Sequence, residues 1–132
     1  MRPFGRKASI GVAGVLMMLA AAAVAFGHGW MAPAGAAARR NPLPRDAATI
    51  DRGRAVYASL CAECHGAEGR GDGPKAARTW PAPTDLTLIG SHSPGDIAWK
   101  IENGRGDMPA FKDKLAAADI WALTHWIQSL KR

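Results

Sequence analysis

The chain has few of the residues that most small cysteine or metal sites need. Its 132 residues include only two cysteines, Cys61 and Cys64, and contain no second C-x-x-C and no H-x-x-H pair. A disulfide between residues three apart closes a loop too small to stabilise a fold appreciably. A structural zinc site normally requires four ligands, so the missing second pair argues against zinc. A thioredoxin-like dithiol is also disfavoured, because a Gly-rich loop and not a βαβ pattern follows the motif.

Acidic residues are absent from the first 45 positions, although the chain carries a net charge of +6. Six of its 17 basic residues precede Asp46, which leaves 17 − 6 = 11 basic residues to match the 11 acids from Asp46 onward. The folded part is therefore formally neutral, and the basic balance does not predict nucleic-acid binding.

Charge is missing altogether from residues 8–27, which follow the basic leader "MRPFGRK". A helix of this length would extend about 30 Å, roughly the thickness of a bilayer's hydrocarbon core, so the segment predicts an N-terminal apolar helix that anchors the chain. A cleaved signal peptide is the alternative, because small-residue sites occur at residues 34–36 and 36–38. Either way the rest of the chain is expected on the periplasmic side of the inner membrane, anchored or soluble.

Three sequence regions follow from these patterns. Residues 1–29 are the predicted signal peptide or membrane anchor. Residues 30–48, rich in Ala, Pro and Gly, are expected to form a tether without regular periodicity, and residues 49–132 are expected to form one folded domain.

The two cysteines lie in "CAECH", where His65 directly follows Cys64. The pattern C-x-x-C-H is a haem attachment signal. Residues i and i+3 of a helical turn share one face, so Cys61 and Cys64 can each bond one vinyl group of the same porphyrin. His65 can then reach the iron as the proximal ligand.

Helical patterns surround this motif. Upstream, Thr49 or Asp51 can cap a helix that delivers the motif at its end. Further on, Ser93 can cap a second helix that has Pro94 in its first turn and Gly104 at its end. A final amphipathic helix has its apolar face at Ile120, Leu123, Ile127 and Leu130.

A single methionine lies within the predicted domain. Met108 is the only methionine after Met31, and it lies in the loop "NGRGDMPAF". Lone methionines often fill cores, but a Gly/Pro loop position favours a ligand role. His92 and His125 compete with Met108 for the sixth iron position.

In these motifs the chain resembles the class I (mitochondrial-like) c-type cytochromes over roughly residues 49–132. The resemblance implies an all-α domain of three to four helices around one covalent haem c, with Met108 as the distal ligand. It also implies that the carbonyl of Pro74 accepts a hydrogen bond from His65, and that Gly53 and Tyr57 meet Leu123 and Trp126 where the first and last helices cross. Trp80 could contact a haem propionate, although packing is the simpler role for Trp80 and Trp99.

Histidine–methionine ligation saturates the iron, which suits single-electron transfer between redox proteins and not catalysis. The predicted partners are a redox donor and acceptor, and the chain is expected to be a monomer or a subunit of a redox complex. Lys75, Arg78, Arg105, Lys112 and Lys114 could steer an acidic partner, although acids are interleaved with them. The alternatives are a five-coordinate gas sensor or peroxidase, which would need His92 and Arg105 to converge, and a fixed subunit of a larger oxidoreductase.

Overall fold

The computed structural model describes residues 29–89 and 92–130. The chain divides into two compact units, Met1–Trp30 and Met31–Arg132, and the second is described below. The apolar helix predicted at residues 8–27 lies outside the described residues. Within the described ranges, no helix combines the length and apolar character that a membrane span requires.

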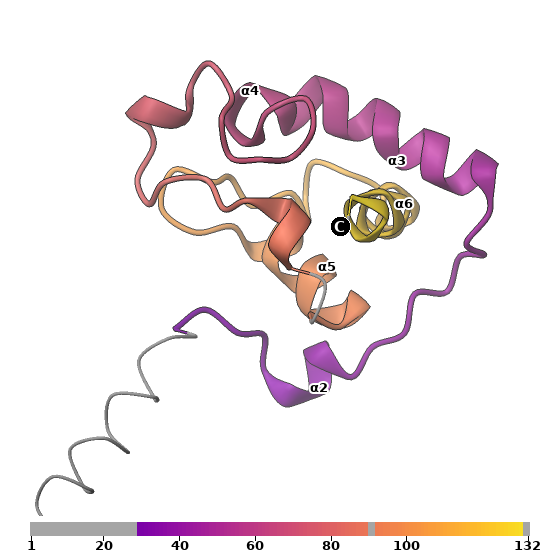
Figure 1. Cartoon of the computed structure of the whole chain (residues 1–132). Coiled ribbons are helices and arrows are strands. Elements are labelled where there is room, and N and C mark those ends of the chain that lie inside the picture. Colours follow the sequence, from indigo (N-terminus) through magenta and orange to yellow (C-terminus); the bar gives the residue numbers. More distant parts are fainter. Residues whose placement is uncertain (1–28, 90–91, 131–132) are drawn as a thin grey trace, which may run out of the picture. The chain divides into compact units, whose positions relative to one another are not determined.

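The second unit is built from helices, as the sequence predicts for the folded part. Residues 31–89 and 92–130 contain no strand, and an isolated bridge pairs Arg105 with Met108. The elements, labelled in part in Figure 1, are α2 (Ala34–Ala37), α3 (Ala47–Leu60), α4 (Ala62–His65), the 3₁₀ turns η2 (Ala76–Arg78) and η3 (Leu86–Leu88), α5 (Pro94–Asn103) and α6 (Ala117–Ser129).

Helix α3 begins earlier than predicted because a different residue caps it. The carboxylate of Asp46 accepts a 2.8 Å hydrogen bond from the amide of Thr49. Asp46 is therefore the N-cap, and Thr49 and Asp51, the two expected caps, lie inside the helix. The cap helps set the start of the helix that leads into the Cys61 motif.

Helix α5 has the ends that the sequence predicts. Ser93 is its N-cap and accepts a hydrogen bond from the amide of Asp96, Pro94 occupies its first turn, and Gly104 is its C-cap. Ile97 and Ile101 are buried on its inner face. Helix α5 thus packs against α6 and delivers the chain to the loop that carries Met108.

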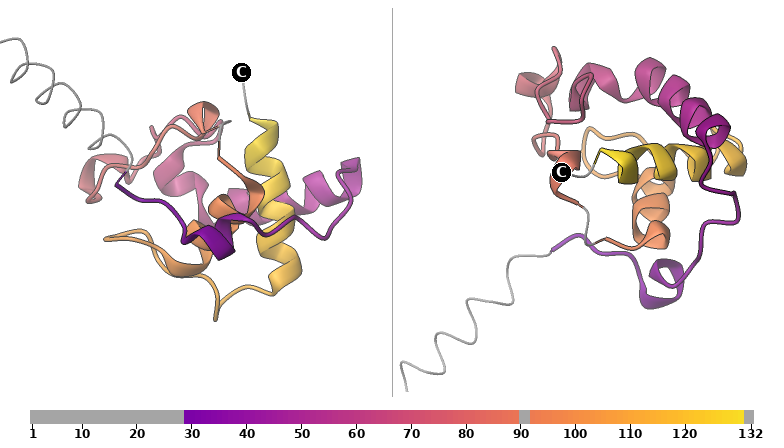
Figure 2. Two further views of the ribbon diagram at one scale, coloured as in Figure 1. Left: turned by 90° about the horizontal axis from the view of Figure 1, so that it is seen from below. Right: turned by 45° about the vertical axis from the view of Figure 1, so that its right-hand side comes forward.

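The first and last helices of the domain, α3 and α6, cross in direct contact (Figure 2). A Cβ atom on Gly53 would lie 2.1 Å from the carbonyl oxygen of Ala122, so only glycine permits this approach. The rings of Tyr57 and Trp126 lie 6.0 Å apart between centroids, within the usual range for an aromatic pair. Leu123 is fully buried beside them, which confirms the predicted crossing.

The core lies between α3, α5 and α6. Its buried members include Tyr57, Ile97, Phe111, Ile120 and Leu123. Of the predicted inner face of α6, Ile120, Leu123 and Ile127 are buried and Leu130 is half-buried. Each buried aliphatic or aromatic side chain contributes about 1.5–3 kcal/mol through removal from water.

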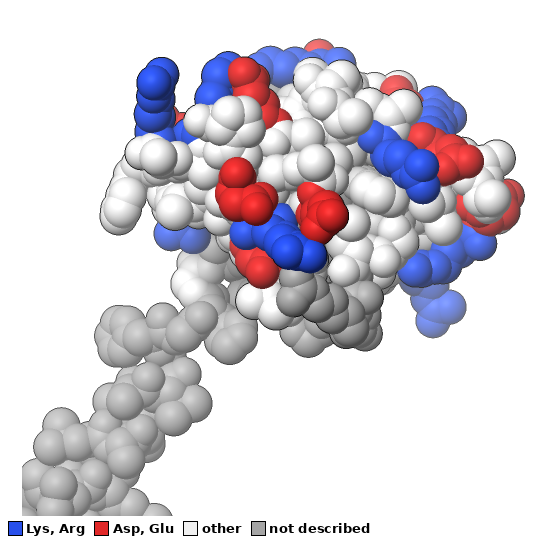
Figure 3. Space-filling model, turned by 45° about the horizontal axis from the view of Figure 1, so that its top comes forward, with Lys and Arg blue, Asp and Glu red and all other residues white. Residues whose placement is uncertain are grey.

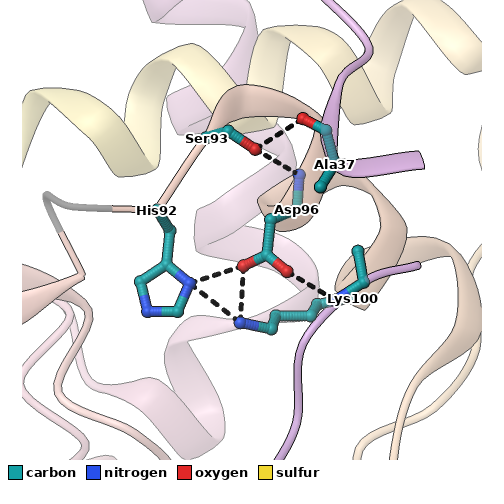
Figure 4. A network of polar contacts seen from close by, with 6 residues as sticks. Ala37, His92, Ser93, Asp96 and Lys100 are labelled. Carbon is teal, nitrogen blue, oxygen red and sulfur yellow. Dashed lines mark hydrogen bonds and ion pairs between the residues drawn. The ribbon is translucent and has the colours of Figure 1, made fainter. Parts of the chain in front are cut away.

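Residues 31–46, the N-terminal segment, lie on the surface of α5 and α6. Asp96 on α5 is 1% exposed, and its carboxylate accepts a 2.7 Å hydrogen bond from the amide of Ala32. Figure 4 shows the adjacent contacts, in which Ser93 donates to the carbonyl of Ala37 while His92 and Lys100 approach the Asp96 carboxylate.

Further contacts continue along the same segment. Arg39 makes two hydrogen bonds with the carboxylate of Glu102, at 3.0 and 2.7 Å, and its guanidinium lies over the ring of Trp121. Asn41 donates to the carbonyl of Trp121, and His125 lies 3.0 Å from the carbonyl of Leu43. The compact unit accordingly begins at Met31, whereas the sequence places the domain boundary at residue 49.

Candidate functional site

The C-x-x-C-H motif forms one helical turn directly after α3. The amide of Cys61 bonds the carbonyl of Tyr57, and the amides of Cys64 and His65 both bond the carbonyl of Cys61. This turn brings Cys61 and Cys64 to one side of the helix, as the spacing predicts. Both thiols are free and half-buried.

The environment keeps the Cys61 thiol neutral. Burial raises the pKa of Cys61 to about 12, and the neighbouring Cys64 adds to the increase. The raised pKa favours the protonated thiol at neutral pH. The free side chain of Cys61 is therefore a protonated thiol at neutral pH.

The ring of His65 is oriented by a backbone carbonyl. Its Nδ1 atom lies 3.1 Å from the carbonyl oxygen of Thr84. When Nδ1 donates this bond, the lone pair of Nε2 is available to a metal. Burial lowers the pKa of His65, and the bond to Thr84 opposes this only in part, so the neutral, metal-binding form is favoured.

The carbonyl that lies beside the His65 ring belongs to Thr84, whereas the resemblance assigned this acceptor role to Pro74. The amide of Gly73 donates to Cys64 and that of Lys75 to Glu63, so the Pro74 stretch is held on the carbonyls of the motif turn.

A second loop brings Thr84 to the histidine. Asp85 accepts from the amide and hydroxyl of Thr87, and Leu86 donates to the carbonyl of Gly69. A Cβ atom on Gly71 would lie 2.5 Å from the carbonyl oxygen of Pro83, so a glycine permits the two loops to meet.

Met108 lies in a turn and not on a helix face, as predicted. Its amide bonds the carbonyl of Arg105, and its own carbonyl accepts from the amide of Arg105, both at 3.0 Å. The side chain is half-buried. Met108 therefore belongs to a structured loop outside the buried core cluster.

The two competing histidines have other partners. His92 lies beside the carboxylate of Asp96, and His125 is buried against the carbonyl of Leu43. His92 and Arg105 flank opposite ends of the ten-residue helix α5, about 15 Å of helix apart. The fold thus does not bring together His92 and Arg105, which the peroxidase hypothesis requires.

Large apolar side chains are exposed on the segments that carry the site. Leu60 precedes Cys61 and is 46% exposed, while Trp80 and Leu88, on either side of Thr84, are 80% and 75% exposed. Trp80 therefore does not pack in the core. Two thiols on one turn and an available imidazole nitrogen nevertheless fit a covalent porphyrin.

Comparison with known proteins identifies the family. Residues 48–127 match the family described as "Cytochrome C oxidase, cbb3-type, subunit III". The chain belongs to this family of c-type cytochromes. Its cofactor is accordingly covalent haem c, one per chain given the single C-x-x-C-H motif.

Relatives include both subunits of complexes and small cytochromes. The chain is 32% identical over 88 residues to the cbb3-type cytochrome c oxidase subunit FixP of Azorhizobium caulinodans, covering 66% of this chain and 29% of FixP. It is 32% identical over 83 residues to cytochrome c6 of Picosynechococcus, covering 58% of this chain and 69% of that protein.

A solved structure shares the fold. It is the Kuenenia stuttgartiensis reducing HAO-like protein complex Kustc0457/Kustc0458, with a TM-score of 0.63 and 33% identity. The match covers 69% of this chain and 47% of that one. The chain thus spans less than half of two of these proteins, and family membership implies electron transfer without naming partners.

Proposed function

We propose that the protein is a single-electron carrier in which Cys61 and Cys64 bind the haem covalently while His65 and Met108 are its axial ligands. The observation that carries this proposal is the motif turn, where both thiols share one side of the helix and the bond from His65 to Thr84 leaves Nε2 available. The proposal includes a position on the periplasmic side of the inner membrane, with residues 8–27 as the anchor unless they are cleaved.

The haem supplies a one-electron couple, and the chain's residues keep its geometry constant. Thr84 orients the imidazole of His65, and the Arg105–Met108 turn holds the thioether. With His65 and Met108 both bound to the iron, the haem would have no open position for a substrate and would supply only electron transfer.

Docking to redox partners is proposed to be brief and not dominated by one sign of charge. Figure 3 shows basic and acidic side chains interspersed on the face it displays. Near the motif, Lys75 pairs with Glu63 at 2.7 Å and Arg70 with Glu68 at 2.8 Å, so part of the basic charge is neutralised locally. Weak redox encounters characteristically use small interfaces.

A second candidate, a fixed cytochrome subunit of a larger oxidoreductase, is favoured by the comparisons. FixP and the Kuenenia complex are both named as parts of assemblies. The haem chemistry would be the same, and the two proposals differ in whether the partner stays bound. Native mass measurement of the chain purified from its source membranes distinguishes a free carrier from a complex.

Optical spectra of the haem-loaded full chain test the ligand set. A weak sulfur-to-iron charge-transfer band in the near-red is expected in the oxidised wild type and should vanish in Met108→Ala. The reduced wild type should resist carbon monoxide. If the wild type lacks the band and binds carbon monoxide readily, the iron is five-coordinate, and the gas-sensor or peroxidase alternative replaces electron transfer.

Location is tested separately. The protein should sediment with the inner-membrane fraction and retain residues 8–27 when the purified chain is analysed by mass spectrometry. A soluble periplasmic chain that starts after residue 34 would show that the segment is a cleaved signal.

A further inference from the structure

The loop that carries Met108 is closed at its base by backbone hydrogen bonds. The amide of Phe111 donates to the carbonyl of Ile101 at 3.0 Å, and the amide of Lys112 donates to the backbone carbonyl of Glu102 at 3.2 Å. The end of α5 and the chain after the loop therefore run side by side. Residues 103–110 form a loop whose two ends are held together by these hydrogen bonds.

The tip of the same loop is attached to a distant part of the chain. The amide of Trp80 donates to the carboxylate of Asp107 at 2.7 Å, and the amide of Asp107 donates to the carbonyl of Trp80 at 2.9 Å. Gly106 has a φ of +58°, and a Cβ atom there would lie 2.3 Å from the carbonyl oxygen of Trp80. A glycine is required for this contact. We call the reciprocal pair the Trp80–Asp107 clamp.

The clamp links the two sides of the candidate iron site. Trp80 begins the stretch "WPAPT", and Thr84 at its end accepts the hydrogen bond from His65. Pro81 and Pro83 restrict φ within the stretch, which limits its flexibility. One five-residue segment, residues 80–84, thus contacts the proximal histidine at one end and the neighbour of Met108 at the other.

We propose that Asp107 is a positioning residue for the distal ligand: through the clamp it holds Met108 against the support that also orients His65. The inference rests on the proposed ligation by Met108. Asp107 directly precedes Met108, so a movement of its backbone displaces the thioether. Loss of the clamp should increase the population of conformations of residues 103–110 in which the Met108 thioether has left the iron.

Imidazole binding to the oxidised protein measures this shift, because an added ligand binds only when the thioether is displaced. Removing one charge-assisted hydrogen bond at an exposed site should tighten the apparent imidazole affinity roughly threefold to tenfold. Asp107→Ala should show this change and a weaker near-red band in the absence of imidazole.

Two matched variants separate position from charge. Asp107→Asn removes the same charge but keeps an oxygen that can accept from the Trp80 amide, so its imidazole affinity should stay within about twofold of the wild type. Asp113→Ala removes an exposed acid from the segment after the loop and should also leave the affinity unchanged.

Three results would overturn the inference. Equal tightening in Asp107→Asn and Asp107→Ala would show a charge effect and no positioning role. An unchanged affinity and band in Asp107→Ala, with the band present in the wild type, would refute the positioning role of Asp107 and leave Met108 ligation intact. Absence of the band in the wild type would refute Met108 ligation itself, and the positioning role with it.

Discussion

The hydroxyl of Tyr57 donates a 2.6 Å hydrogen bond to the carbonyl of Gly66, the residue after the motif histidine. This bond ties the fully buried end of a core side chain to the first residue of the loop beyond His65. The helix crossing and the haem motif therefore share a polar contact, and damage to one is expected to reach the other.

Tyr57→Phe should destabilise the protein by about 1 kcal/mol, the usual net value of one hydrogen bond. The cost stays low because the carbonyl of Gly66 also accepts from the amide of Gly69. Burial raises the pKa of Tyr57, with Cys61 and Asp72 adding to the rise, so the hydroxyl keeps its proton at neutral pH.

Urea unfolding followed by circular dichroism measures this loss. The difference from the wild type should be constant between pH 6 and 9. Above the ordinary tyrosine pKa of about 10 the unfolded wild type loses a proton that the folded state keeps, so the wild-type advantage should shrink. Ser59→Ala, an exposed hydroxyl on the same helix, is the control and should change stability by less than about 0.5 kcal/mol.

Gly53→Ala should be among the most damaging single-methyl additions. Its Cβ would meet the backbone oxygen of Ala122 at 2.1 Å, so the helices must separate. Overpacking of this kind costs about 1–3 kcal/mol, visible as a lower thermal midpoint. Gly35→Ala, where no atom lies within 4 Å of the added Cβ, should be neutral or slightly stabilising. Equal effects of the two variants would contradict the close crossing.

Arg39→Ala should loosen the N-terminal segment without disturbing the haem site. The guanidinium donates two hydrogen bonds to the carboxylate of Glu102, and these bonds raise the pKa of Arg39. Because the pair is partly exposed, its loss should cost only about 1 kcal/mol. Amide hydrogen exchange at residues 32–43 should quicken. Arg40→Ala, the exposed neighbour, should leave exchange unchanged.

Asp96 should make stability depend on acid pH. Burial by itself raises the pKa of Asp96, but hydrogen bonds from Lys100, the amide of Ala32 and His92 outweigh it and the pKa is lowered. A lowered folded-state pKa contributes stability above the unfolded value of about 3.9, and this contribution is lost as pH falls below that value.

The variant Asp96→Asn removes this dependence. At pH 7 it should cost about 3 kcal/mol, because it removes the buried carboxylate charge to which Lys100 donates a 2.6 Å hydrogen bond. The free energy of unfolding of wild type and variant should converge between about pH 4 and pH 2. A gap that stays constant over this range would show that the Asp96 charge contributes nothing to the fold.

Local signals made the helices predictable. Ser93, Pro94 and Gly104 determine both ends of α5 through contacts within a few residues, so the sequence pattern suffices. The start of α3 was misplaced because Asp46, Thr49 and Asp51 can all act as caps, and only the chain's path into the helix selects Asp46. The crossing of α3 and α6 was predicted from the resemblance to class I c-type cytochromes, whose crossing roles Gly53, Tyr57, Leu123 and Trp126 match by spacing.

Several of the contacts that sequence reasoning missed are made to backbone carbonyls of distant segments. Thr84 contacts His65 only because two loops converge. The sequence signal for the second loop was the turn at Pro83, Thr84 and Asp85, in which the Asp85 carboxylate accepts a hydrogen bond from Thr87. Residues 31–46 dock through the carbonyls of Ala37, Leu43 and Trp121, which no side-chain pattern reveals. The assignment of the ligands themselves stays a prediction until the spectra are measured.

The contact between Gly53 and Ala122 joins positions at opposite ends of the domain sequence. Closing so long a loop has an entropic cost that local helix formation does not repay, so the packed core can form only when α6 is present. A growing chain that has not yet reached Ala117 already carries the C-x-x-C-H motif but lacks the helix against which α3 packs. The order of the elements along the chain therefore means that a partly synthesised chain carries both cysteines before it has the helix that completes the core.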